Sequence, residues 1–134
     1  MQSKAVLSHA EITRILSNAR EEAQRNQWAV AIAIVDDGGH PLALERLDGC
    51  APISAYIAIE KARSAALGRR ETKGYEEMVN NGRTAFLSAP LLTSLEGGVP
   101  VMVDGQVIGA VGVSGVKAEQ DAQVAKAGAT ALQA

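Results

Sequence analysis

Cysteine and histidine are scarce in this sequence, and it carries no export or membrane signal. The single cysteine, Cys50, permits no internal disulfide, so nothing requires an oxidising compartment. One cysteine and two histidines also cannot supply the four clustered ligands of a structural zinc site. No apolar run has the roughly 20 residues that a membrane helix needs, and the N-terminus lacks the features of a signal peptide. We therefore expect a cytoplasmic protein without a membrane partner.

Basic clusters and aromatic residues are also rare. The formal net charge is −2, and the longest basic run is Arg69-Arg70. We expect no nucleic-acid partner, because phosphates would need many clustered cations. With one Phe, one Trp and two Tyr, the 47% hydrophobic fraction is mostly small and aliphatic. Such side chains let helices and sheets approach closely and suit subunit interfaces, which predicts a homo-oligomer.

The length and the balanced composition predict one globular domain over residues 1–134. Ser8 and Glu11 form a capping box at the start of the first helix, and Gly68 is expected to close the second. Helices are predicted over residues 8–26, 52–67, 72–79 and 118–132. Strands are predicted over residues 28–35, 40–47, 91–95, 99–103 and 106–113. Hairpin turns join these strands as antiparallel neighbours, so we expect an α+β (α/β) fold with helices packed on an antiparallel sheet.

His40 is the first candidate site residue. It opens the second strand directly after a glycine turn and lies close to Asp36 in the sequence. A carboxylate beside a histidine fixes its tautomer and raises its basicity, which suits a general base or a metal ligand. The alternative is a turn histidine that only hydrogen-bonds the Asp36-Asp37 loop.

Lys61 is the second candidate. It falls on a helix face lined by alanines at 58, 62 and 65, where a buried ammonium would need a carboxylate from the protein or from a ligand. Alternatively, its stem lies along the alanines and its charge stays in water. Cys50 is either a small core residue or a reactive ligand.

Glycines at 109, 112 and 115 recur in and just after the last predicted strand, at a spacing that differs from a dinucleotide-binding fingerprint. Bare backbone there would let a helix or a neighbouring subunit approach the strand. The alternative is a ligand lying against that backbone, with the Ser114-Gly115 amides available to an anion.

Several motifs occur in an order that is more specific than any one of them. They are Val35-Asp-Asp-Gly-Gly-His40, Glu60-Lys-Ala-Arg63, Gly97-Gly-Val-Pro100, Asp104-Gly105 and Gly109-Ala-Val-Gly-Val-Ser-Gly115. In these motifs, over about residues 8 to 132, the sequence resembles the GlcG/HbpS-type heme-binding (heme-degrading) domain. That domain is similar to the C-terminal domain of PduO-type corrinoid adenosyltransferases.

The resemblance implies a profilin-like fold, in which helices flank a five-stranded antiparallel sheet. It also implies a homo-oligomer and, in some members, heme as the cofactor. The residues that it implies for the pocket are His40, Lys61, Thr72 and Ser114. Carboxylates of the ligand would meet an arginine in bidentate pairing, and the candidates are Arg69, Arg70 and Arg83.

Three functions remain open. The first is an oligomeric binding protein for heme or a related tetrapyrrole, with His40 as the axial ligand. The second is an isomerase or hydrolase for a small carboxylic or carbonyl metabolite, with His40 and Asp36 as the base and Lys61 or an arginine holding the substrate's charge. The third is a non-catalytic structural accessory subunit. A binding site would require the histidine turn, the lysine helix and the glycine-lined strand to surround a common cavity.

Overall fold

Apolar periodicity and turn residues place most helices and strands where the sequence predicts them. The computed structural model describes residues 1–133, and over this range it has four α-helices, a 3-10 helix and four strands. The elements are α1 (His9–Arg25), β1 (Ala31–Asp36), β2 (Pro41–Arg46), α2 (Ile53–Gly68), α3 (Lys73–Asn80), η1 (Thr84–Ser88), β3 (Gly98–Val103), β4 (Gln106–Ser114) and α4 (Ala118–Ala129). The predicted capping box is confirmed, because Ser8 N–H donates to the Glu11 carboxylate at 3.0 Å.

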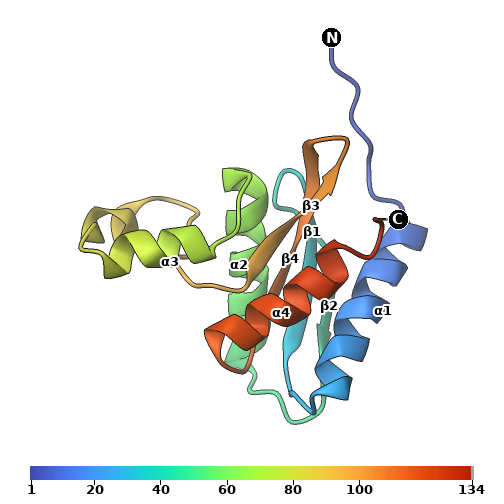
Figure 1. The fold of residues 1–134 in the computed structure, drawn as a ribbon, viewed down its shortest axis with the longest axis horizontal. Coiled ribbons are helices and arrows are strands. Elements are labelled where there is room, and N and C mark those ends of the chain that lie inside the picture. Colours follow the sequence, from blue (N-terminus) through green and yellow to red (C-terminus); the bar gives the residue numbers. More distant parts are fainter. Residues whose placement is uncertain (134) are drawn as a thin grey trace.

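The sheet is antiparallel throughout, with the strand order β2-β1-β4-β3 (Figure 1). The apolar strand β1 is central, as predicted, and pairs with β2 on one side and β4 on the other. Each tight turn therefore joins neighbouring strands. β1 and β4 also pair, although paired residues such as Ile34 and Val111 are more than 70 positions apart in the sequence. The predicted α+β class with helices on an antiparallel sheet is confirmed.

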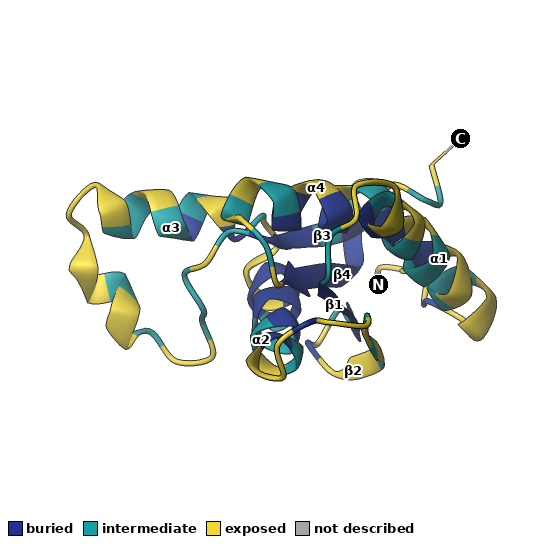
Figure 2. Ribbon diagram, turned by 90° about the horizontal axis from the view of Figure 1, so that it is seen from below, coloured by how far each residue is buried: buried dark blue, intermediate teal, exposed yellow. Residues whose placement is uncertain are grey.

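Helices cover both faces of the sheet (Figure 2). Alternate residues of β1 point to opposite faces. Ile32 and Ile34 join the larger core, which packs against α1 and α4, whereas Ala31 and Ala33 join an alanine-rich core beneath α2. The small side chains on the second face draw α2 close to the sheet, which is the tight contact that the composition predicts.

Gly112 shows how close that approach is. It lies in β4 opposite Ala33, and a Cβ atom there would collide with the carbonyl oxygen of Ala58 and the backbone nitrogen of Ala62 in α2. The prediction that bare backbone in this strand admits a helix is confirmed at this position.

The five-stranded sheet implied by the resemblance is wrong in its strand number, because residues 91–95 form no strand. Their backbone hydrogen-bonds to a side chain of a helix and not to a neighbouring strand, because Thr93 N–H donates to Ser64 Oγ of α2 at 2.7 Å. The next contact has the same character, with Glu96 N–H donating to the Glu76 carboxylate of α3 at 3.2 Å. Side-chain acceptors thus replace the strand ladder that the apolar run suggested.

The end of α2 differs from the prediction by one residue. Gly68 is still helical, and Arg69 takes the left-handed conformation that ends the helix, with φ at +59°. Glycine is needed at 68 for space, because a Cβ there would overlap the Tyr75 hydroxyl. Beyond Arg69, α3 and η1 extend away from the sheet as an arm (Figures 1 and 2).

Within residues 1–133 we find no helix whose length and apolar character would let it span a bilayer.

Substituting Gly112→Ala should destabilise the fold by about 1–3 kcal/mol, because the added methyl group forces α2 away from β4. Gly74→Ala is the matched control, since Gly74 lies inside α3 and a methyl group there meets only the flexible end of Arg70. That control should be neutral or gain up to about 1 kcal/mol from helix propensity. Denaturant unfolding of both variants measures the difference, and equal effects would contradict the close packing.

Candidate functional site

The β1–β2 turn presents His40 at one end of the sheet. Asp36 organises the turn, since its Oδ1 accepts hydrogen bonds from the backbone N–H groups of Gly38 and His40, each at 2.9 Å. Gly39 completes the turn with a φ of +80°, a conformation that glycine adopts without strain. The Asp-Asp-Gly-Gly sequence therefore fixes both the direction of β2 and the position of the histidine.

The same carboxylate fixes the His40 ring. Nδ1 of His40 lies 3.0 Å from Oδ1 of Asp36. Burial opposes ionisation of Asp36, but the hydrogen bonds from His40 and Gly38 outweigh it and hold the pKa of Asp36 below its usual value. An ionised carboxylate only accepts, so Nδ1 carries a proton, and in the neutral ring the lone pair is then on Nε2. The ring is 77% exposed, so Nε2 is available to a ligand or substrate.

Apolar side chains border this turn on the α2 side of the sheet. Leu67 and the stem of Arg63, both from α2, lie against Gly39. Leu42 and Leu44 of β2 are 38% and 46% exposed, and Leu67 is 42% exposed. The edge strand and the end of α2 thus leave an uncovered apolar surface beside the histidine.

Lys61 lies elsewhere, inside the protein. It is 4% exposed, and its Nζ donates to the Val113 carbonyl at 2.9 Å and to Oδ2 of Asp121 at 3.1 Å. The other carboxylate oxygen of Asp121 accepts from Val116 N–H at 3.1 Å. Burial is the largest influence on Asp121 and raises its pKa in spite of Lys61. Of the two alternatives for Lys61, the structure shows the one in which a protein carboxylate holds a buried ammonium.

Thr72 and Ser114 lie near this ion pair in the interior. Thr72 is fully buried, and its Oγ1 accepts from Gly98 N–H at 2.8 Å. Ser114 is 7% exposed and ends β4, paired with Ala31. Cys50 is buried with its sulfur 4.0 Å from the Ser114 carbonyl, in the setting of a small core residue.

One chain does not bring the histidine turn and Lys61 together. Asp36 pairs with Gly109 of β4, whereas Lys61 bonds Val113, four residues further along that strand. At the strand rise of about 3.3 Å per residue, the two positions are roughly 13 Å apart along the sheet. Within one chain they therefore belong to different surroundings.

The three candidate arginines are also separated. The Arg69 guanidinium reaches the β1–β2 turn, where it donates to the Asp37 carbonyl at 2.6 Å. Arg70 stacks on Tyr75 with 4.8 Å between its guanidinium carbon and the ring centroid, and Arg83 stacks on Phe86 at 4.6 Å. Arg69 is thus the one of the three that reaches the turn holding His40.

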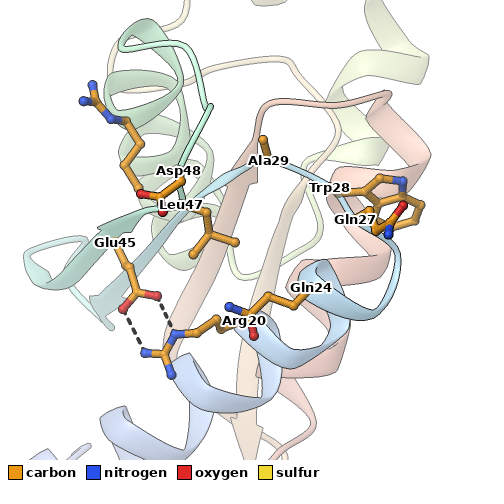
Figure 3. Close-up of a pocket in the computed structure, with 9 residues that line it drawn as sticks. Arg20, Gln24, Gln27, Trp28, Ala29, Glu45, Leu47 and Asp48 are labelled. Atoms are coloured by element: carbon orange, nitrogen blue, oxygen red, sulfur yellow. Dashed lines mark hydrogen bonds and ion pairs between the residues drawn. The ribbon is translucent and has the colours of Figure 1, made fainter.

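A cavity of about 540 Å³ between α1 and the end of β2 was not predicted (Figure 3). A bidentate ion pair between Arg20 and Glu45 closes one end, and Trp28 lies at the other (Figure 3). The full lining is Arg20, Gln24, Gln27, Trp28, Ala29, Glu45, Arg46, Leu47 and Asp48. The single tryptophan just before an apolar strand was a sequence signal for this cavity. The residues at the end of β2 that complete the lining come from another segment, which local sequence does not identify.

Over residues 1–133, no group of three or more His, Cys, Asp or Glu side chains is arranged to hold a metal ion. His40 could therefore act in metal binding only as a ligand to a metal that other groups hold in place.

Substituting Lys61→Met should cost about 3–5 kcal/mol at neutral pH, because it leaves the Asp121 carboxylate buried without its partner. The pKa of Asp121 is raised in the folded protein, so the folded state binds the proton more tightly than the unfolded chain. The contribution of Asp121 to the free energy of unfolding therefore falls as the pH rises from the ordinary pKa of a carboxyl group through the raised pKa of the folded state. The penalty of Lys61→Met relative to wild type should shrink in acid, where the carboxyl group is neutral.

Two controls accompany this measurement, made by denaturant unfolding between pH 4 and pH 8. The double variant Lys61→Met, Asp121→Leu should recover most of the loss, since it removes both charges. Lys73→Met breaks an exposed pair with Glu77, 4.0 Å apart, and should cost no more than about 1 kcal/mol. A double variant no more stable than the single one would contradict this account of the pair.

Known proteins are similar to this chain in fold and in sequence. The family model described as "Haem degrading protein HbpS-like" matches residues 7–130. Protein GlcG of Escherichia coli K12 is 71% identical over 114 residues, covering 85% of each chain. A PduOC–heme complex superposes with a TM-score of 0.86 at 27% identity and 96% coverage of each chain. A double mutant of Streptomyces reticuli HbpS superposes with a TM-score of 0.89 at 29% identity, covering 100% of this chain and 92% of the other.

These matches span nearly the whole chain and confirm the resemblance that the motifs indicate. The chain belongs to the HbpS-like family.

Proposed function

We propose that this protein binds heme or a related tetrapyrrole, with His40 as the axial ligand. The observation that carries the proposal is the exposed His40 ring, whose Nδ1 is held by Asp36 and whose Nε2 is directed away from that bond. The family description and the PduOC–heme complex favour heme over other ligands.

The donor set of the turn suits an axial ligand. In metal sites the N–H of the second ring nitrogen of a coordinating histidine commonly donates a hydrogen bond to a carboxylate, which fixes the ring and strengthens it as a ligand. Asp36 stands in that position relative to His40. A single histidine would suffice, because the porphyrin would supply the remaining nitrogen ligands, and bound heme would contribute redox and oxygen chemistry.

The surroundings of His40 suit a flat apolar ligand on one side. Leu67 lies against the turn, and the exposed Leu42 and Leu44 extend the apolar surface along β2. One chain leaves the opposite side of such a ligand in water. We therefore propose that a second copy of the chain covers it, which would also bury the exposed leucines and complete the homo-oligomer expected from the composition.

The same pair of residues supports a second candidate function. An Asp36–His40 pair with a free Nε2 is the arrangement of a general base, in which the carboxylate stabilises the imidazolium formed by proton transfer. Chemistry on a bound ligand, in keeping with the heme degradation named in the family description, would use that proton transfer. Lys61 has no part in this candidate, since its ammonium is bonded inside the protein.

Titration of hemin into the purified protein should shift the Soret band and saturate. His40→Ala should abolish the shift, because the axial nitrogen is lost. Asp36→Asn should weaken binding by about 10- to 100-fold, the usual effect of removing the group that supports a ligating histidine.

His9→Ala is the matched control for this titration, since His9 is the other histidine of the chain and lies exposed on α1. It should leave the spectrum and the affinity unchanged. If His40→Ala still shifts the Soret band, His40 is not the ligand. If the wild-type protein gives no shift, it does not bind heme.

A further inference from the structure

Arg69 is held in place unusually well for an exposed side chain. Its backbone adopts a left-handed conformation, with φ at +59°, which is uncommon outside glycine and asparagine. Its Nη1 donates to two carbonyls, that of Ala66 at 2.8 Å and that of Asp37 at 2.6 Å. These bonds tie the guanidinium to both the end of α2 and the β1–β2 turn.

The charge of Arg69 is not neutralised by its neighbours. Both acceptors are neutral carbonyls, and among residues 1–133 no carboxylate lies within ion-pair distance of this guanidinium. Asp37, whose carboxylate feels the charge of Arg69, pairs with Lys4 at 2.7 Å. Lys4 is the main cause of the lowered pKa of Asp37, and the more distant charge of Arg69 adds to it. The donors on Nη2 and Nε of Arg69 have no acceptor within the described part of the chain.

A cavity of about 480 Å³ opens beside these donors. Arg69 and Lys4 supply two positive charges to its wall, and Gln2 and Gln106 supply amide groups. The remaining wall comes from the tip of the β3–β4 hairpin, at Met102, Gly105 and Val107. Lys4 pairs with Asp37, which does not itself line the cavity, so among the described residues Arg69 is the cation of this wall that no carboxylate pairs with.

We infer that the cavity between Arg69, Lys4 and the β3–β4 hairpin binds a carboxylate, with the Arg69 guanidinium as its main contact. A guanidinium presents parallel N–H groups that match the two oxygens of a carboxylate, and fixing it in advance lowers the entropy lost on binding. Arg70 and Arg83 lack this setting, since each is stacked on an aromatic ring in the arm.

The carboxylate has two possible sources. It belongs either to a free small acid or to the side chain of a tetrapyrrole bound at His40, because Arg69 and His40 flank the same Asp36–Gly39 turn. The second source rests on the proposed function, whereas the first does not.

Binding of sodium propionate, followed by two-dimensional ¹H–¹⁵N NMR of the full chain, tests the site. Wild-type protein should give saturable shifts at Arg69, Gly105 and Gln106. Arg69→Gln should weaken binding about tenfold or more, in line with the strength of hydrogen bonds to charged groups, and Lys4→Gln about threefold. Arg70→Gln removes the neighbouring arginine of the same charge, which does not line this cavity, and should leave binding unchanged. Unsaturable shifts, or equal affinities in wild type and Arg69→Gln, would overturn the inference.

A comparison of hemin with its dimethyl ester then distinguishes the two sources. If the tetrapyrrole supplies the carboxylate, Arg69→Gln should weaken hemin binding about tenfold and leave binding of the ester unchanged. If a free acid is the occupant, Arg69→Gln should affect neither porphyrin while still weakening propionate. A protein that binds propionate through Arg69 but no hemin would support the anion site and refute the proposed function, so the two failures are distinguishable.

Discussion

The buried ion pair between Lys61 and Asp121 is the contact on which the layered arrangement depends. Lys61 comes from α2 on one side of the sheet, Asp121 from the first turn of α4 on the other, and the Val113 carbonyl between them belongs to β4. A buried charge is costly unless its hydrogen bonds are satisfied, so each partner fixes the other. Three elements are therefore locked in one relative position at the end of the sheet where β4 finishes.

The ion pair lies at one end of the sheet, and tight turns form the opposite end. The small side chains beneath α2 hold the helix close to β1 and β4, so the end of α2 reaches the β1–β2 turn and places Leu67 against Gly39. Arg69 then continues from the helix to the Asp37 carbonyl. Packing in the interior thus sets the position of the exposed histidine and of the arginine beside it, although neither side chain is itself buried.

Local sequence patterns predicted local structure well, but they did not predict features that depend on contacts between segments far apart in the sequence. The capping box at Ser8 and the turn at Asp36 depend on neighbouring residues, so the sequence was sufficient for both. For Lys61 the chemistry of a buried ammonium indicated a carboxylate, but the partner lies 60 residues away and no local pattern identifies it. Residues 91–95 have the composition of a strand, yet Ser64 supplies their hydrogen bond, and tertiary context overrides propensity there. The 540 Å³ cavity is likewise assembled from α1 and the end of β2, which sequence reasoning treated separately.

The bonds between Thr72 and Gly98 have a consequence for how the sheet meets other molecules. β3 lies at the edge of the sheet, and Thr72 occupies the outward N–H and C=O of Gly98, at 2.8 and 3.0 Å. Two residues on, Pro100 has no N–H to offer, and the register shifts between Val101 and Met102. An unprotected edge invites the addition of a foreign strand, and the usual protections are proline, irregular register and a covering segment. Here all three act on one strand, so this side of the sheet is guarded against aggregation by strand addition.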